Sequence, residues 1–241
     1  MSRAAAALMA LGLVAGSPAA GWASGLELRL GAFFPRGQSN LFDDVRELYT
    51  PDSRADECTV TSCPGVQVED WNNLYGGAEY SFNLAPKVEM AFSLDGYGKE
   101  IESSYRDSVR DDGSEIRQTL QLTMIPLGVS FRVTPLHRQA PVQPYLTVGG
   151  DAFFYRYEEF GEFIDFFDDS RPISSDSFVS DGVVFGGHAA VGLRVPIGHD
   201  FAITGEVRYQ FAPRQQMDDD FSLNEIDLNG TTATIGVRLR F

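Results

Sequence analysis

Residues 231–241 read TTATIGVRLRF and carry the clearest structural signal of the chain. Apolar side chains alternate with other residues over the second half of this stretch, at Ile235, Val237, Leu239 and Phe241. Arg238 and Arg240 stand between them. Alternation with a period of two is typical of a β-strand whose two faces meet different surroundings. The stretch therefore predicts a strand with one apolar and one charged face.

Seven further segments repeat this alternation. They are residues 25–35, 74–84, 87–97, 116–133, 142–157, 183–195 and 201–211. In residues 116–133 the apolar side chains change from even to odd positions at Pro126. A change of phase at a proline predicts a β-bulge, where one residue leaves the ladder of hydrogen bonds. We therefore expect eight strands, one of them bulged.

The links between the eight segments alternate in length. Three are short, at residues 84–87, 134–141 and 197–200. Four are long and polar, at about residues 36–71, 98–115, 158–182 and 212–227. Short periplasmic turns and long extracellular loops alternate in this way in outer-membrane barrels. The sequence thus predicts an all-β fold, an eight-stranded antiparallel transmembrane β-barrel with four long extracellular loops and three short periplasmic turns.

A soluble lipocalin-like barrel and a β-sandwich are the alternatives to this fold. Both would bury the apolar face, and the polar face carries Glu and Arg at mid-strand. On the apolar face the aromatic side chains gather towards the strand ends, as in the two interfacial girdles of a membrane barrel. The expected girdles are Phe34, Phe154, Phe185, Tyr209 and Phe211 outside, and Phe82, Phe131, Phe201 and Phe241 at the periplasmic end. The membrane barrel is the favoured interpretation.

The first 23 residues differ from the rest of the chain. Arg3 is followed by the apolar run AAAALMALGLV, and small residues stand at Gly21 and Ala23. This layout predicts a secretory signal peptide at residues 1–23, cleaved before Ser24, with the barrel at residues 24–241. A membrane anchor is the alternative, but the apolar run is too short to span a bilayer. In an exported protein, the two cysteines, Cys58 and Cys63, are expected to form a disulfide.

The net charge is −15, from 34 acidic and 19 basic residues. Such a chain has too little positive charge to neutralise the phosphate backbone of a nucleic acid, so a general nucleic-acid binder is excluded. The four long links hold 27 of the acids, which places the negative charge outside the cell. The nearest EF-hand pattern, starting at Glu225, has Gly236 where a bidentate acid is needed, so no metal site is predicted. Weak bridging of lipopolysaccharide phosphates by divalent cations stays open.

Three stretches resemble a known family. The run TIGVRLRF (234–241) resembles the assembly signal of bacterial outer-membrane proteins, carried by Ile235, Val237, Leu239 and Phe241. PYLTVGGDAFFYRY (144–157) and FGGHAAVGLRVPI (185–197) resemble the fifth and sixth strands of small OmpA/OmpX-type barrels, grouped as "outer membrane protein beta-barrel domain". The resemblance implies localisation in the outer membrane of a Gram-negative-type cell and recognition of the last strand by the assembly machinery. It says little about activity.

Eight strands leave a lumen that side chains can fill. The face opposite the lipid carries both signs of charge, which predicts an ion-pair network that closes the lumen. We expect pairs within two layers: Glu27, Glu89, Arg132, Arg194 and Arg238 near the periplasmic mouth, and Arg29, Glu79, Glu206 and Arg208 deeper. Further charged side chains expected to point inward are Asp95, Asp151, Arg117 and Arg240.

An aromatic rim is predicted in the outer half of the lumen. Its members are Phe33, Tyr75, Tyr97, Phe153 and Tyr155. They could line a pocket for a lipophilic solute, as in OmpW-type barrels, or pack under loop segments. Apolar residues at helical spacing predict two short amphipathic helices that would cover the rim, in SNLFDDVRELYT (39–50), with Asn40 as its cap, and in EEFGEFIDFF (158–167). Packing under these segments is the favoured interpretation.

No catalytic site is predicted. His137 and His199 fall in short links, and His188 points into the lumen without a neighbouring serine. A single histidine there is more often a hydrogen-bonded filler than a catalyst. We therefore expect a structural or surface-interaction role without a cofactor; lipophile binding or transport is the first alternative and a lipid-modifying enzyme the second. The expected partners are outer-membrane lipid, lipopolysaccharide and the assembly machinery, with no nucleic acid, for a monomeric protein.

Overall fold

The computed structural model describes residues 24–58, 62–136, 140–166, 168, 170–221 and 224–241. The predicted signal peptide and His137 lie outside these residues. Eight strands of the described chain form one closed ring in which every neighbouring pair is antiparallel. They are β1 (Ser24–Pro35), β3 (Asn73–Ala85), β4 (Val88–Val109), β5 (Glu115–Val133), β6 (Gln143–Ile164), β7 (Ile173–Ile197), β8 (Phe201–Phe211) and β11 (Gly230–Arg240). The pairing of β1 with β11 closes the barrel, and the predicted fold class is confirmed.

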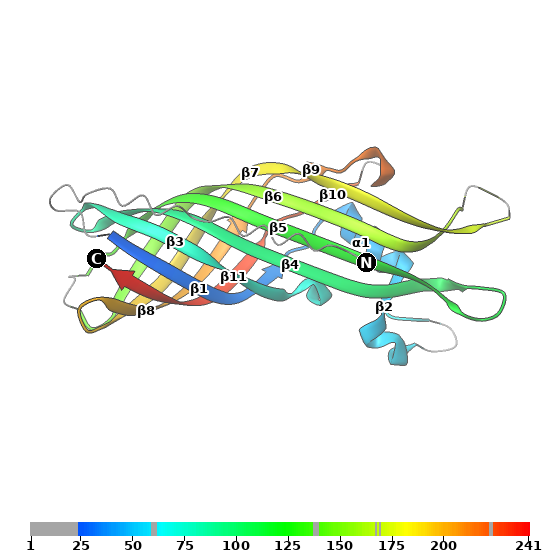
Figure 1. The fold of residues 1–241 in the computed structure, drawn as a ribbon, viewed down its shortest axis with the longest axis horizontal. Helices are drawn as coiled ribbons and strands as arrows, with labels where there is room; N and C mark the ends of the chain where they lie inside the picture. The colour runs from blue at the N-terminus through cyan, green and yellow to red at the C-terminus, as the bar shows by residue number, and fades with distance from the viewer. Residues whose placement is uncertain (1–23, 59–61, 137–139, 167, 169, 222–223) are drawn as a thin grey trace.

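The strands differ in length, and this shapes the outer end of the molecule. β1, β3, β8 and β11 have 11 to 13 residues, close to the 9 to 11 or so that cross a bilayer. β4, β5, β6 and β7 have 19 to 25 residues. Their outer halves project beyond the rest of the barrel, at the end opposite the C-terminus (Figure 1). Four strands therefore carry a sheet out of the membrane.

Two segments predicted as long loops, 98–115 and 158–182, are mostly strand. Residues 98–104 of β4 pair with residues 117–123 of β5, and the connecting turn is tight, with Gly113 at φ +81°. Residues 158–164 of β6 pair with residues 173–179 of β7. The helix predicted in residues 158–167 is therefore wrong. Phe160 pairs with β5 on one side and with β7 on the other, and Phe163 pairs with β7, so strand pairing outweighs the helical spacing.

The predicted β-bulge at Pro126 is absent from the ladders on either side of it. β5 keeps one register with β6 across Ile125, Pro126 and Leu127. Even positions point into the barrel throughout: Leu120, Leu122 and Met124 are buried in its outer part. The apolar pattern changes face because the surroundings change. Inside the membrane the outer surface meets lipid, whereas above it the interior is apolar and the outer surface meets water.

The outer mouth is covered by the segment between β1 and β3. It contains α1 (Asn40–Leu48), β2 (Tyr49–Pro51) and the 3₁₀ turns η1 (Asp52–Glu57) and η2 (Val68–Trp71). α1 buries Leu41, Phe42 and Val45, as its spacing predicts, but Ser39 takes the N-cap position expected for Asn40. β2 pairs with the outer part of β4, beyond the end of β3. A second small cover between β8 and β11 comprises β9 (Gln215–Gln216), η3 (Asp219–Phe221) and β10 (Glu225–Ile226).

The wall that surrounds the lumen is apolar on its outside. Leu28, Leu30, Leu146, Val148 and Ile235 are all more than half exposed, as expected of side chains that face lipid. The five aromatic rings of the predicted outer girdle are all exposed. Phe34, Tyr209 and Phe211 lie near the outer ends of β1 and β8, whereas Phe154 and Phe185 lie near the middle of β6 and β7, because those two strands continue outward. In the part of the chain that is described, no helix is long and apolar enough to cross a membrane.

Candidate functional site: a charged lumen under an aromatic cap

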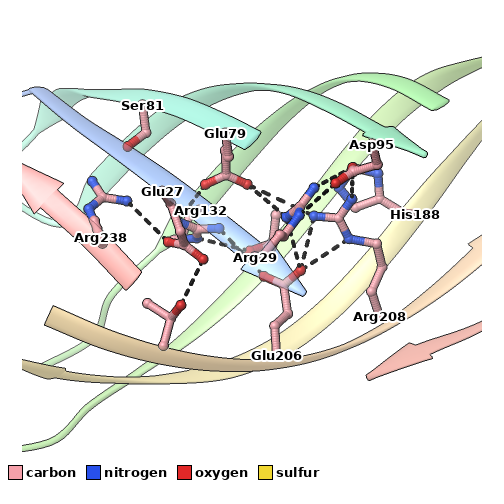
Figure 2. Close-up of polar contacts among 12 residues, drawn as sticks. Glu27, Arg29, Glu79, Ser81, Asp95, Arg132, His188, Glu206, Arg208 and Arg238 are labelled. Carbon is pink, nitrogen blue, oxygen red and sulfur yellow. Dashed lines mark hydrogen bonds and ion pairs between the residues drawn. The ribbon is translucent and has the colours of Figure 1, made fainter. Parts of the chain in front are cut away.

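The centre of the lumen is held by Arg29 of β1. Its Nε and Nη2 donate to both carboxylate oxygens of Asp95 on β4, at 2.8 and 2.5 Å. Its Nη1 lies 3.2 Å from Glu79 on β3 and 3.6 Å from Glu206 on β8 (Figure 2). A planar guanidinium fits two carboxylate oxygens at once, so the pair is specific in geometry as well as in charge.

Arg132 of β5 links the two predicted layers. Its Nη1 is 2.8 Å from Glu79, its Nη2 is 3.5 Å from Glu206, and its side chain is fully buried. The guanidinium also lies 4.4 Å above the ring of Tyr145. Arg208 completes this group, with Nη2 2.9 Å from Glu206. Ion pairs therefore form between the layers as well as within them.

Glu89 of β4 lies at the periplasmic end of the network. It accepts two hydrogen bonds from Arg194, at 2.9 and 3.0 Å, and lies 3.2 Å from Arg238. Glu27 accepts a hydrogen bond from Thr204, and its other oxygen is 3.9 Å from Arg238. The structure thus brings all nine predicted members of the network together in a buried salt-bridge network. Asp95 belongs to it too, whereas Arg117, expected inside, lies on the exposed outer sheet beside Glu115.

His188 sits beyond the network, towards the outer side (Figure 2). Its Nδ1 is 2.6 Å from Oδ2 of Asp151 on the neighbouring strand, and the imidazole is buried. The sequence placed both side chains in the lumen but did not pair them. His188 thus fills the lumen next to a carboxylate, with the charged network on one side and the aromatic rim on the other.

All five residues of the predicted aromatic rim are buried, at 5% exposure or less. The ring of Phe33 packs edge-on against Tyr97, with centroids 4.9 Å apart. The hydroxyl of Tyr97 donates to the backbone oxygen of Trp71, and the indole of Trp71 packs on Phe42 of α1. Rim and cover thus form one apolar cluster, called here the aromatic cap. Besides the rim it contains Leu41, Phe42, Val45, Trp71, Tyr157, Phe221, Ile226 and Leu228.

A buried carboxyl group within the cap is that of Glu159 in β6. The residue lies five positions beyond the girdle residue Phe154, and therefore outside the membrane. The hydroxyls of Tyr157 and Tyr49 donate to it, at 2.7 and 3.3 Å. Burial raises the pKa of Glu159, and Asp44 of α1 adds to this, while the two hydroxyl contacts lower it. The net result is a buried carboxyl held by neutral donors.

Sequence reasoning missed Trp71, Tyr157 and Glu159. Tyr157 is the last residue of the predicted strand 142–157, and Glu159 continues the inward alternation of Tyr145 and Tyr155. Reading this alternation to the end of the strand and two residues beyond would have found both. Trp71 lies in a 3₁₀ turn and gives no periodic signal.

The first extracellular segment, between β1 and β3, is attached to the outer part of β4. Cys58 and Cys63 form the predicted disulfide. Nε of Arg106 on β4 donates to the backbone oxygen of Cys63, at 2.7 Å. Arg54 pairs with Asp70 and also donates to the backbone oxygen of Gly65, at 3.0 Å. The contact of Arg106 with Cys63 thus holds the segment against β4, while the disulfide and the contacts of Arg54 join parts of the segment to one another.

The residues of the predicted assembly signal lie on the lipid-facing side of β11 and just after it. Ile235, Val237, Leu239 and Phe241 are all exposed there. The last strand is paired with β1 and β8 and thus presents an apolar row of side chains on the outer face of the barrel.

Comparison with solved structures finds small barrels. Neisserial surface protein A (NspA) has a TM-score of 0.44 and 10% identity, over 92% of this chain and 99% of that one. Ail of Yersinia pestis, in complex with the heparin analogue sucrose octasulfate, has a TM-score of 0.39 and 12% identity, over 92% and 99%. The N-terminal barrel domain of OprF from Pseudomonas aeruginosa has a TM-score of 0.38 and 11% identity, over 90% and 97%.

No curated protein matches the chain in sequence. The sequence profile described as "Outer membrane protein beta-barrel domain" matches residues 6–241, which is nearly the whole chain. The match agrees with the closed ring of eight strands and with the apolar outer wall. The protein belongs to the outer membrane protein beta-barrel domain family and is located in the outer membrane.

Proposed function

We propose that this protein is a non-conducting barrel that holds a rigid, acidic sheet above the outer membrane for contact with other molecules. The observation that carries the proposal is the doubly closed lumen. Arg29, Arg132 and Arg208 bridge carboxylates from several strands across the barrel, and the aromatic cap fills the outer mouth. Such a barrel serves as a support for what projects from it.

The filled rim also bears on the alternative of lipophile transport. Phe33, Tyr75 and Phe153 are at most 1% exposed, and they pack against one another and against cover segments. A lipophilic solute would have to displace side chains of α1 and η2 to reach the lumen. This packing supports a protein-filled rim over a solute pocket.

The projecting sheet has an edge without a second strand partner. Residues 173–186 of β7 pair with β6 on one side, and pairing with β8 begins only at Gly187. The segment after β8 contacts this edge at Ser180, whose Oγ accepts from the backbone N–H of Asp218, and at Phe178, which packs on Phe221; residues 173–177 lie beyond these contacts. Exposed strand edges pair readily with an extended segment of another chain. Asp176 and Asp181 lie along this edge, and most acids of the chain lie in the outer segments. The partner chemistry that fits is an extended, basic segment of another protein.

Conductance recordings in planar bilayers test whether the lumen is closed. Purified protein should give no channels above the leak of the bilayer, and stepwise conductance from the intact chain would refute the proposal.

Fluorescence anisotropy with an extended Lys/Val peptide tests the edge. The double variant Asp176→Lys/Asp181→Lys should weaken binding at least tenfold. The double variant Asp107→Lys/Asp111→Lys, with both substitutions on exposed residues of the β4–β5 hairpin, changes the net charge by the same amount and is the matched control. It should weaken binding only about twofold for each substitution, as is usual for exposed charges. Equal losses in both variants would show a diffuse acidic field and would refute the edge as the contact.

The remaining expected partners are proposals of the same kind. We infer that the apolar wall contacts lipid and lipopolysaccharide, that the last strand is recognised by the assembly machinery, and that the protein is a monomer. The exposed row from Ile235 to Phe241 supports the second of these. Replacing Phe241 with Ser should reduce the folded fraction in the membrane without changing the stability of protein refolded in detergent.

A further inference from the structure

The periplasmic mouth of the barrel contains a small polar hollow of about 50 Å³. It lies where the turn between β3 and β4 meets the ends of β7 and β11. Its charged lining consists of Lys87, Glu89, Arg194, Arg238 and Arg240. Four cations therefore share the hollow with one carboxylate.

The carboxylate of Glu89 already contacts three arginines. Glu89 accepts both hydrogen bonds of Arg194, at 2.9 and 3.0 Å, and pairs with Arg238 at 3.2 Å. Arg132 approaches the same group from deeper in the lumen, at 3.8 Å. Glu27, with Oε2 3.9 Å from Nη1 of Arg238, is a second nearby carboxylate. Two carboxylates cannot neutralise the four cations of the hollow together with Arg132. Positive charge is therefore left over at the periplasmic end, although the lumen as a whole is nearly balanced.

The hollow also contains donors without acceptors. Among the described residues, none accepts a hydrogen bond from Nε or Nη1 of Arg238, from Nε of Arg194 or from Nε of Arg240. The side chain of Arg238 is 3% exposed, so bulk water does not solvate it fully. Buried charged donors without acceptors are unfavourable, because their desolvation is not compensated. An anion with several acceptor oxygens would correct both the charge and the hydrogen bonding.

We propose that this hollow binds a phosphate group. A phosphate offers acceptor oxygens in several directions, and arginine forks match them in geometry. The volume is suitable, because a single water needs only about 10–15 Å³ by the same kind of measure. Lys87 donates to the backbone oxygen of Pro135, at 2.8 Å, and its ammonium has two further protons to offer. Thr134 and Ser24 add hydroxyl groups to the lining.

Two sources can supply this phosphate. The hollow lies at the periplasmic end of the strands, where the headgroups of the inner leaflet are found. A phospholipid headgroup could enter from the side, and inorganic phosphate could enter from the periplasm. The chemistry of recognition is the same for both.

Calorimetric titration of the detergent-solubilised protein with inorganic phosphate tests the site, at constant ionic strength set with chloride. Saturable binding is expected. The double variant Lys87→Gln/Arg240→Gln removes two cations without touching the Glu89 pairs, and it should weaken binding at least tenfold. The control, Arg156→Gln/Arg214→Gln, removes two exposed cations at the opposite end and should bind as the unaltered protein does. Absence of saturable binding, or equal binding in the Lys87→Gln/Arg240→Gln variant, would overturn the proposal.

Native mass spectrometry of protein extracted from membranes distinguishes the sources. One retained phospholipid, lost in the Lys87→Gln/Arg240→Gln variant, supports a lipid headgroup. Protein without retained lipid that binds inorganic phosphate equally well in nanodiscs and in detergent supports free phosphate. A phospholipid retained equally by both variants would place the lipid elsewhere and count against the site.

Discussion

Replacing Arg132 with Met is the sharpest test of the charged lumen. Met keeps most of the length of the side chain and removes the guanidinium. In the structure this group lies within 4 Å of three carboxylates, at 2.8 Å from Glu79, 3.5 Å from Glu206 and 3.8 Å from Glu89, with no exposed surface. The variant therefore leaves buried carboxylates short of one cation.

The expected loss in the free energy of unfolding depends on the cations that remain beside Glu79 and Glu206. Removing one partner of a buried ion pair costs about 3–5 kcal/mol, because a buried charge is left without compensation. Here Arg29 still lies 3.2 Å from Glu79, and Arg208 still lies 2.9 Å from Glu206. These contacts limit the loss, so we expect the lower end of the range, about 3 kcal/mol.

The assay is urea unfolding in phospholipid vesicles, followed by tryptophan fluorescence and by the mobility of unheated protein in gels. With a slope of about 1–3 kcal/mol per M urea, the midpoint should fall by roughly 1–3 M. Arg156→Met is the control, because that side chain is 55% exposed beside Glu158 and should cost about 1 kcal/mol at most. Adding Glu79→Gln to Arg132→Met should recover part of the loss. A loss in Arg132→Met no greater than in Arg156→Met would refute the reasoning.

Three further predictions concern the aromatic cap, the Cys58–Cys63 disulfide and the barrel wall. Burial raises the pKa of Glu159, so the neutral carboxyl is the form that stabilises the cap. This stabilisation is complete below the pKa of the unfolded chain, about 4.3. It is lost as the pH rises through the pKa of the folded protein. Proteolysis of the cover should therefore be faster at pH 8 than at pH 4, and Glu159→Gln should remove most of the difference. Replacing Cys58 and Cys63 with Ser should speed hydrogen exchange in the first extracellular segment without changing the urea midpoint of the barrel; a lower midpoint would contradict the purely local role. Gly31→Ala should reduce refolding yield, since the new Cβ would lie 1.9 Å from a backbone oxygen of β11, whereas Gly205→Ala, with nothing within 4 Å, should refold normally.

The barrel was predictable from the sequence because membrane strands encode their two faces residue by residue. Leu28 and Leu30 alternate with Glu27 and Arg29, and the structure places the first pair towards lipid and the second in the lumen. The same alternation located the charged network. It could not assign pairs, because Arg132 reaches Glu79 from a strand that is not adjacent to β3 in the ring.

The outer half was harder to predict, for a physical reason that β5 shows most clearly. Along its outward positions, Arg117, Thr119, Gln121 and Thr123 are followed by Ile125, Leu127, Val129, Phe131 and Val133. Its inward positions change in the opposite sense, from Leu120, Leu122 and Met124 to Ser130 and Arg132. The backbone stays in phase while water replaces lipid outside and the aromatic cap replaces the charged network inside.

This inversion links the closed lumen to the projecting sheet. A strand that left the membrane with an apolar outer face and a charged inner face would expose the first to water and provide nothing for the cover to pack on. Because the polarity is reversed at the level of Met124, the same strands continue outward with a water-facing surface and an apolar interior. Trp71 and α1 then pack on apolar side chains of the outer sheet, and they close the mouth of the barrel. The cap is therefore the condition for extending β4 to β7 beyond the membrane, and substitutions that loosen it should disorder the outer sheet before they affect the barrel.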